Sequence, residues 1–256
     1  MTDDGELERV QAVWRELTTA RHGFAEHDVC LAETDSHRAA PDGWVAVVRI
    51  GHRAVVAGPA AQLDRISDDA RRSSPVQLVD RDFVRRHFRP LHTLGPARLY
   101  YGSPTVPVPA GRTIGPLELS DSRVQAVLAD ASQAERDEAG VGHTTSGIFV
   151  ALDADGVPIS VCAWTLWPGD VAHISSLTAA AHRGCGAGLA AAHRALTEAA
   201  ARGLLPQWRV AHWNAASIGL AQRLGLRHLG DQYSIRLDEA RSGSPDQSEE
   251  TGTSLR

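Results

Sequence analysis

A short glycine-rich segment narrows most strongly what this chain can fold into. Arg183-Gly184-Cys185-Gly186-Ala187-Gly188 lies between an apolar run at 171–178 and an alanine- and leucine-rich stretch at 189–202. The first has the residue types of a strand and the second those of a helix. Glycines at such a turn let backbone N–H groups converge on an anion at the positive end of the helix dipole. The segment therefore predicts a phosphate-binding turn.

Spacing separates the glycine-rich loops that could occupy this place. A Walker loop needs a lysine after its last glycine, and all 26 basic side chains of this chain are arginines. A dinucleotide loop needs GxGxxG, whereas the third glycine here comes one residue early. An ordinary strand-to-helix turn without a ligand also fits the hexapeptide taken alone. The RxxGxG spacing of Arg183, Gly186 and Gly188 resembles the pyrophosphate loop of the GNAT superfamily of acyl-CoA N-acyltransferases.

A second motif follows in the order typical of that superfamily. Residues 207–213 read as a strand, and Asn214-Ala215-Ala216-Ser217 then opens a short helix that ends at Leu224-Gly225. This resembles the family's NxxS/A segment, although Asn214 is also a plain N-cap. The resemblance covers residues 113–238. It implies an α/β (α+β) fold with a mixed, mostly antiparallel sheet of six or seven strands, flanked by helices. Its fourth and fifth strands splay apart around acyl-CoA.

The rest of the chain divides into three further parts. Residues 1–105 contain helical and strand patterns and predict a smaller N-terminal α/β region. This region is either a degenerate, cofactor-free copy of the same fold or an unrelated cap. A Pro/Gly-rich linker at 106–112 leads to the acyltransferase domain at 113–238. Residues 239–256 are rich in Ser, Asp, Glu and Gly, which predicts a disordered tail.

Composition excludes several classes of function. A net charge of −5 without a basic stripe argues against nucleic acid as a partner. The sequence has no signal peptide and no apolar stretch of membrane-spanning length, so we expect a cytoplasmic protein without a membrane partner. Its three cysteines are odd in number and lack CxxC spacing, which argues against a disulfide framework and against a metal site. A homodimer is left open.

The resemblance implies a set of cofactor-binding residues. Acetyl-CoA is the expected co-substrate, with no metal. Backbone groups of the fourth strand hold the thioester and pantetheine, the glycine-rich turn holds the pyrophosphate, and the NxxS segment flanks the pantetheine arm. The corresponding positions are Ser176, Leu177, Thr178, Arg183, Gly184, Cys185, Gly186, Ala187, Gly188, Asn214 and Ser217.

The catalytic acid and base are less well defined. Many family members carry a tyrosine acid seven residues after the asparagine, and the matching residue here is Ala221. Tyr233 is the candidate replacement, if the following strand brings it into the cleft. Alternatively the coenzyme A thiolate leaves without a protein acid. His173 is the candidate base because its ordinary pKa near 6.5 suits proton removal at neutral pH; it could equally pack against a helix.

Three residues are candidates for the acceptor pocket. Glu138 and His143 precede the second strand of the domain, where the family often walls the acceptor site, although both also fit solvated loop positions. Trp164 and Trp167 fall on opposite faces of a regular strand, so we expect one of them to line the pocket and the other to pack in the core. An aromatic face in the pocket would favour a cation. We take Trp164 as the pocket residue.

Together these features predict an acetyl-CoA-dependent N-acetyltransferase. The expected acceptor is a primary amine of a small molecule, which attacks the thioester directly in a ternary complex. A protein or peptide amine acetyltransferase is the second enzyme hypothesis. A catalytically silent acyl-CoA-binding module is the non-enzyme hypothesis, favoured by Ala221 and by the lack of a clear acidic base.

Overall fold

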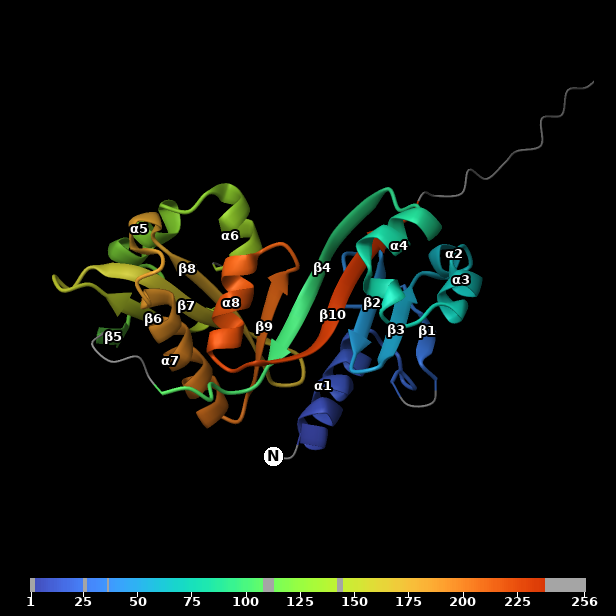
Figure 1. Cartoon of the computed structure of the whole chain (residues 1–256), viewed down its shortest axis with the longest axis horizontal. Coiled ribbons are helices and arrows are strands. Elements are labelled where there is room, and N and C mark those ends of the chain that lie inside the picture. The colour runs from blue at the N-terminus through green and yellow to red at the C-terminus, as the bar shows by residue number, and fades with distance from the viewer. Residues whose placement is uncertain (1–2, 25–26, 36, 108–112, 142–144, 238–256) are drawn as a thin grey trace, which may run out of the picture.

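A computed structural model describes residues 3–24, 27–35, 37–107, 113–141 and 145–237 (Figure 1). Its α-helices are α1 (Asp3–Leu17), α2 (Ala60–Leu63), α3 (Ser67–Arg72), α4 (Arg81–His87), α5 (Ser122–Ala129), α6 (Gln133–Ala139), α7 (Ala187–Ala201) and α8 (Ala215–Arg223), with 3-10 turns η1 (Gln77–Val79) and η2 (Ala180–His182). Its strands are β1 (Val29–Glu33), β2 (Val45–Ile50), β3 (Arg53–Gly58), β4 (His92–Tyr101), β5 (Thr113–Pro116), β6 (Thr145–Leu152), β7 (Pro158–Trp167), β8 (Val171–Thr178), β9 (Leu205–Ala211) and β10 (Arg227–Arg236). The predicted tail, 239–256, and linker residues 108–112 lie outside the described residues.

The strands form one ten-stranded sheet in the order β1-β3-β2-β10-β4-β9-β8-β7-β6-β5. Pairing is antiparallel except between β1 and β3 and between β8 and β9. The predicted fold class, a mixed and mostly antiparallel sheet flanked by helices, is confirmed. The predicted acyltransferase region, 113–238, supplies β5 to β10, and the strands of residues 29–101 extend the same sheet (Figure 1).

The last strand lies among strands of the N-terminal region. β10 pairs on one side with β2 and on the other with β4, both antiparallel. At Gly230 the backbones of β10 and β2 come so close that a Cβ atom would lie 2.1 Å from the carbonyl oxygen of Arg49. The two regions therefore share one sheet, and the domain division near residue 105 stays a prediction.

Helices cover both faces of the sheet. On one face α7 and α8 pack over a core that includes Trp164 and Trp208, while α2 to α4 cover a separate cluster around Tyr233. On the opposite face α1 packs over a cluster that includes Trp14 and Tyr101, and α5 packs over a fourth cluster. This alternation follows from the strand period of two.

The sheet opens between β8 and β9. Residues Val171–Ile174 of β8 pair in parallel with Leu205–Trp208 of β9. Within the described residues, the two strands do not pair beyond these positions. The segments 175–178 and 209–211 continue beyond it, so backbone groups that face the gap are left for a ligand. The splay implied by the resemblance is present in the structure.

Candidate active site

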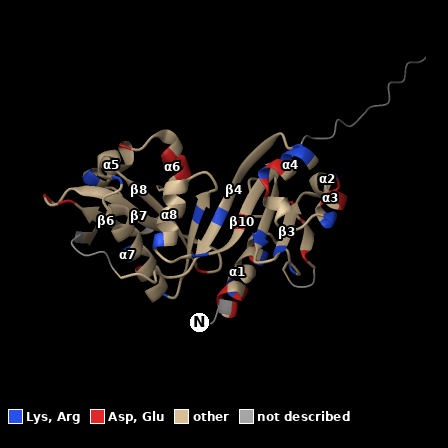
Figure 2. Cartoon of the chain, in the orientation of Figure 1, with Lys and Arg blue, Asp and Glu red and all other residues tan. Residues whose placement is uncertain are grey.

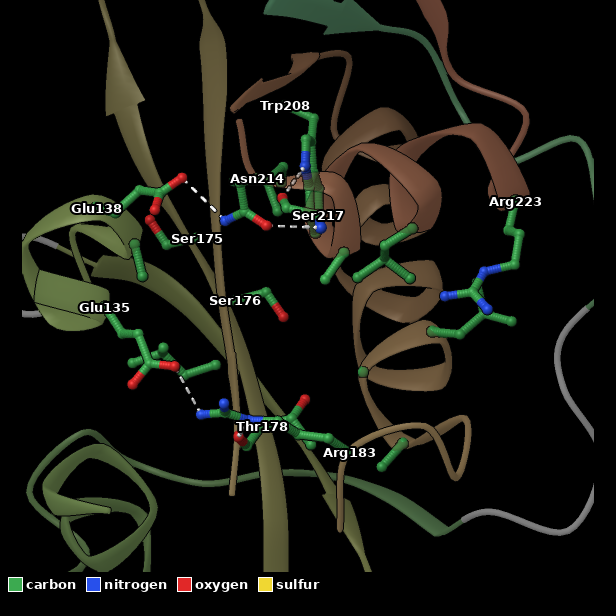
Figure 3. A pocket seen from close by; sticks show the side chains of 18 of the residues that line it. Glu135, Glu138, Ser175, Ser176, Thr178, Arg183, Trp208, Asn214, Ser217 and Arg223 are labelled. Atoms are coloured by element: carbon green, nitrogen blue, oxygen red, sulfur yellow. Dashed lines mark hydrogen bonds and ion pairs between the residues drawn. The ribbon is translucent and has the colours of Figure 1, made fainter. Parts of the chain in front are cut away.

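A cavity of about 340 Å³ lies where β8 and β9 part. Its lining comes from α6, the second half of β8, the glycine-rich turn, and the starts of α7 and α8 (Figure 3). Twelve of the predicted site residues line it: Glu138, His173, Ser176, Leu177, Thr178, Arg183, Gly184, Gly186, Ala187, Gly188, Asn214 and Ser217. The predicted phosphate turn, the strand β8 and the NxxS segment thus line one and the same cavity.

The glycine-rich turn forms an open cradle at the start of α7. Gly186 is the N-cap residue with φ 85°, in the left-handed region, and no side chain caps the helix there. A Cβ atom at Gly184 or Gly186 would meet no atom within 4 Å, so both positions face open space. At Gly188, by contrast, a Cβ would lie 2.9 Å from Oγ1 of Thr178. The uncapped N–H groups of a 15-residue helix therefore point toward a space that an anion can fill.

Arg183 at the cradle is held across the cavity by α6. Its Nη2 lies 2.9 Å from Oε1 of Glu135, and its Nε donates to the carbonyl oxygen of Thr178 at 3.3 Å (Figure 3). Both partners of the ion pair are exposed, at 49% and 40% for Arg183 and Glu135, so water screens the attraction. Glu135 also belongs to the capping box of α6 with Ser132. The arginine is therefore close to the cradle but engaged with a carboxylate.

A second bond crosses the same cavity nearer to β9. Asn214 caps α8 by accepting from the backbone N–H of Ser217 at 3.0 Å, and its Nδ2 donates to Oε1 of Glu138 at 2.9 Å. Both interpretations of Asn214, N-cap and cavity residue, hold at once. Figure 3 shows Glu135 and Glu138 extending from the same helix toward opposite parts of the cavity. Figure 2 marks the acidic residues of α6 in red.

His173 is held by a chain of buried hydrogen bonds. Its Nδ1 lies 3.0 Å from Oε1 of Gln207, whose Nε2 donates to the hydroxyl of Tyr101 at 2.7 Å. The indole N–H of Trp14 donates to the same hydroxyl at 2.7 Å. Trp167 stacks on the imidazole with ring centroids 4.3 Å apart. Because Gln207 directs its carbonyl oxygen at the imidazole, Nδ1 carries the proton and Nε2 is an acceptor.

The protonation of His173 differs from the expectation based on its ordinary pKa. Burial, as the largest cause, and the nearby positive charge of Arg209 together lower the pKa of His173 to about 4, against the opposite effect of the bond to Gln207. The imidazole is therefore neutral at pH 7. It can accept a proton, but it is a weaker base than a histidine in water.

The acetyltransferase (GNAT) family model matches residues 118–226. This part of the chain is a GNAT acetyltransferase domain. The match covers both predicted motifs, the glycine-rich turn and the NxxS segment with its helix up to Leu224-Gly225. The predicted family resemblance is confirmed. No curated protein matches the chain in sequence.

Several solved structures resemble the chain in fold. A GCN5-related N-acetyltransferase from Kribbella flavida is 19% identical over 60% of this chain and 62% of its own, with a TM-score of 0.41. A GNAT acetyltransferase from Colwellia psychrerythraea is 14% identical over 62% of each chain, with a TM-score of 0.43. A Salmonella typhimurium protein, whose structure contains its cofactor acetyl-CoA, is 19% identical over 53% of this chain and 99% of its own, with a TM-score of 0.36. This chain spans 62% of the length of the first two.

Some predicted site residues are not part of the described cavity lining. Tyr233 is fully buried on β10, in the cluster covered by α2 to α4. It does not line the cavity, so the expectation that it replaces the usual acid is wrong in its placement. Trp164 is also buried, stacked on Phe149 beneath α7, so the core interpretation applies to it. Cys185 is exposed beside the cradle and outside the cavity lining. His143 lies outside the described residues.

The described cavity lining contains no tyrosine. Ala221, at the position of the usual acid, is fully buried on the inner side of α8. The described residues also contain no group of metal-ligating side chains, and none of their helices has the length and apolar character needed to span a membrane. Of the two predicted ways for the thiolate to leave, the lining favours departure without a tyrosine acid.

Sequence reasoning missed several residues that the GNAT domain brings to the cavity. Glu135 had a recognisable signal, because Ser132 and Glu135 have the spacing of a capping box. Trp208 lines the cavity and donates to Oγ of Ser217 at 3.0 Å. Arg209 lines it from the next position of β9. Nothing in the local sequence distinguishes these two from other strand residues.

Proposed function

We propose that this chain is an acetyl-CoA-dependent N-acetyltransferase that acetylates a primary amine of a small molecule. A single observation carries the proposal: one cavity runs from the uncapped start of α7, through the gap between β8 and β9, to His173 and Glu138. An elongated acyl carrier with a polyphosphate at one end matches such a path.

The residues present fit acetyl-CoA. The cradle around Gly186 and Gly188 offers backbone N–H groups to the pyrophosphate, and Arg183 offers a positive charge. The gap-facing backbone of Ser176 to Thr178 is available to the amides of the pantetheine arm. When bound, acetyl-CoA supplies an acetyl group activated as a thioester.

Residues at the other end of the cavity suit an amine. The carboxylate of Glu138 favours the approach of an ammonium ion, and the bond from Asn214 holds it in place. The amine attacks as the free base, after its ammonium proton has passed to water. His173, neutral at pH 7, accepts the second proton as the carbon–nitrogen bond forms and the carbon–sulfur bond breaks to release the thiolate. Backbone N–H groups at the open edge of β8 stabilise the negative charge that develops on the carbonyl oxygen.

Calorimetric titration with acetyl-CoA, followed by thiol release against a panel of amines, tests the proposal. Saturable binding together with thiol release on a small amine supports it. Release on peptides but on no small amine would instead identify a protein or peptide acetyltransferase. Binding without release on either class would favour the silent acyl-CoA-binding module. Absence of binding would overturn the assignment of the cradle.

Removing the carboxylate of Glu135 is expected to tighten acetyl-CoA binding. In Glu135→Gln, Arg183 no longer pairs with a carboxylate and becomes available to a phosphate, while glutamine preserves the capping box. Because the pair is exposed, we expect a gain of about two- to fivefold in affinity, measured by calorimetry.

Asp137→Asn is the matched control for Glu135→Gln. Asp137 is an exposed acid of the same helix that does not line the cavity, so the variant has the same change in net charge. Equal tightening in both variants would show that overall charge, rather than release of Arg183, controls the affinity.

A further inference from the structure

A second cavity, of about 460 Å³, lies on the face of the sheet that carries α7 and α8. Its floor is made by the central strands β2, β4 and β10, and its walls by η1, the start of α4 and the end of β9. We call it the β4–β10 cavity. It shares no lining residue with the first cavity, although its wall residue Trp213 directly precedes Asn214 of that cavity. Figure 1 shows β4 and β10 running between α8 and α4.

The floor of the β4–β10 cavity contains one carboxylate, that of Asp231, and its oxygens already accept several hydrogen bonds. Asp231 on β10 pairs across the sheet with Arg49 on one side and Arg98 on the other. The Asp231 side chain is 5% exposed. It accepts from Nε and Nη2 of Arg49, and from Nε2 of His212 and of His228, each at 3.0 Å. These bonds hold the pKa of Asp231 well below its usual range in spite of burial. Its charge is therefore fully engaged.

Arg98 is left as the unpaired cation of this floor. It is half-buried on β4, and among the described residues it has no hydrogen-bond or ion-pair partner for its side chain. Arg49, its counterpart on β2, is neutralised by Asp231. A half-buried guanidinium without an acceptor carries a desolvation cost that a bound anion would relieve. Its planar fork matches a carboxylate with two parallel hydrogen bonds.

The walls of the β4–β10 cavity combine the charged residues Asp80 and Arg81 with exposed apolar side chains. Trp213 is 63% exposed and Val76 is 64% exposed, and both are among the most exposed large hydrophobic side chains of the described structure. They border the cavity together with Pro96 and Val79. An exposed tryptophan beside an unpaired arginine offers an aromatic face to a flat group attached to an anion.

We propose that the β4–β10 cavity binds an organic carboxylate that carries an aromatic ring. The carboxylate accepts two hydrogen bonds from Arg98, and the ring packs against Trp213 and Val76. Apart from its two histidines, the lining carries three arginines (Arg49, Arg81 and Arg98) and two aspartates (Asp80 and Asp231), so one positive charge is left, which suits a monoanion. This site is independent of acetyl transfer, because none of its residues belongs to the first cavity.

The full chain should be titrated with benzoate and indole-3-acetate, and also with phenyl phosphate, inorganic phosphate and benzylamine. Saturation-transfer NMR detects binding in the absence of acetyl-CoA. If no carboxylate bound, this second proposal would fail and the proposed acetyl transfer would be unaffected. We expect saturable binding of both aromatic carboxylates, with benzylamine and inorganic phosphate at least about tenfold weaker.

Two variants locate the ligand. Arg98→Gln should weaken benzoate binding by about tenfold or more, since a charge-assisted hydrogen-bond pair is lost. Trp213→Ala should weaken benzoate binding several-fold. Because the side chain of Trp213 is exposed, we expect this variant to fold normally. The matched controls are Arg85→Gln, an exposed arginine of α4 outside the cavity lining, and Leu166→Ala, an exposed hydrophobic residue of β7.

Three results would overturn the proposal. They are the absence of saturable binding by both carboxylates, equal affinities in Arg98→Gln and Arg85→Gln, and inorganic phosphate binding as tightly as benzoate. The last result would show a plain anion site in which the apolar walls play no part. Tighter binding of phenyl phosphate than of benzoate would likewise contradict the choice of a monoanionic carboxylate.

Discussion

Gly186→Asp is expected to weaken acetyl-CoA binding by about 100-fold or more. The substitution places a carboxylate at the start of α7, where the proposed pyrophosphate would lie, so two negative charges meet within a few ångströms. The backbone there has φ 85°, which disfavours a side chain, while the space around the Cβ position is open. The aspartate thus enters the cradle itself. Calorimetric titration with acetyl-CoA measures the loss.

Two further variants separate charge from backbone strain. Gly203→Asp lies just after the other end of α7, has φ 77°, and has an equally open Cβ position. It should lower thermal stability by a comparable amount, about 1 kcal/mol, and leave the affinity for acetyl-CoA unchanged. Gly186→Asn keeps the size and removes the charge, so it should retain most of the binding. Unchanged affinity in Gly186→Asp would mean that the pyrophosphate does not bind at this turn.

The cradle could be predicted because its signals are local. A strand, a run of glycines and a helix follow one another within a few residues, and each has its own propensity. Asn214 could be predicted for the same reason, since an N-cap and its helix are adjacent in sequence. The fold class followed from the order of these segments, and the structure confirms it.

The position of Tyr233 could not be predicted from the sequence. Its placement in the cleft assumed that the strand after α8 lies next to β9. The structure instead inserts β4 of the N-terminal region between β9 and β10, so Tyr233 lies two strands from β9. Pairing between segments more than a hundred residues apart depends on tertiary packing that strand patterns do not encode. The role of the N-terminal region was hidden for the same reason.

The surroundings of His173 were equally invisible in the sequence. Gln207 lies 34 residues after His173, Tyr101 lies 106 residues before Gln207, and Trp14 lies 87 residues before Tyr101. Only the sheet brings β8, β9, β4 and α1 together. The ordinary pKa of histidine is therefore a poor guide, because burial and the charge of Arg209 lower the pKa of this residue. The side-chain direction of Trp164 likewise became clear only from the packing of α7.

His173→Ala is expected to lower kcat by about 100-fold while leaving the affinity for acetyl-CoA within about twofold of the original. A positioned proton acceptor typically contributes this much to a transfer step. The residue lies at the end of the cavity that we propose for the acceptor and is not part of the cradle, so cofactor binding should not depend on it. Single-turnover thiol release and calorimetry on the same sample measure the two quantities. Turnover equal to that of the original chain would remove His173 from the reaction.

The imidazole itself can be followed by NMR, without a known acceptor. Its resonances are assigned by their absence in His173→Ala, and we expect a titration midpoint near pH 4 rather than 6.5. The unfolded chain takes up this proton more readily than the folded one, so the free energy of unfolding decreases as pH falls from 6.5 toward 4.

Tyr101→Phe removes the hydroxyl that anchors Gln207, so it should lower kcat by about tenfold and shift the titration midpoint of His173. A midpoint near 6.5 in the original chain would contradict a buried neutral base, and an unshifted midpoint in Tyr101→Phe would show that the hydrogen-bond chain from α1 does not tune it.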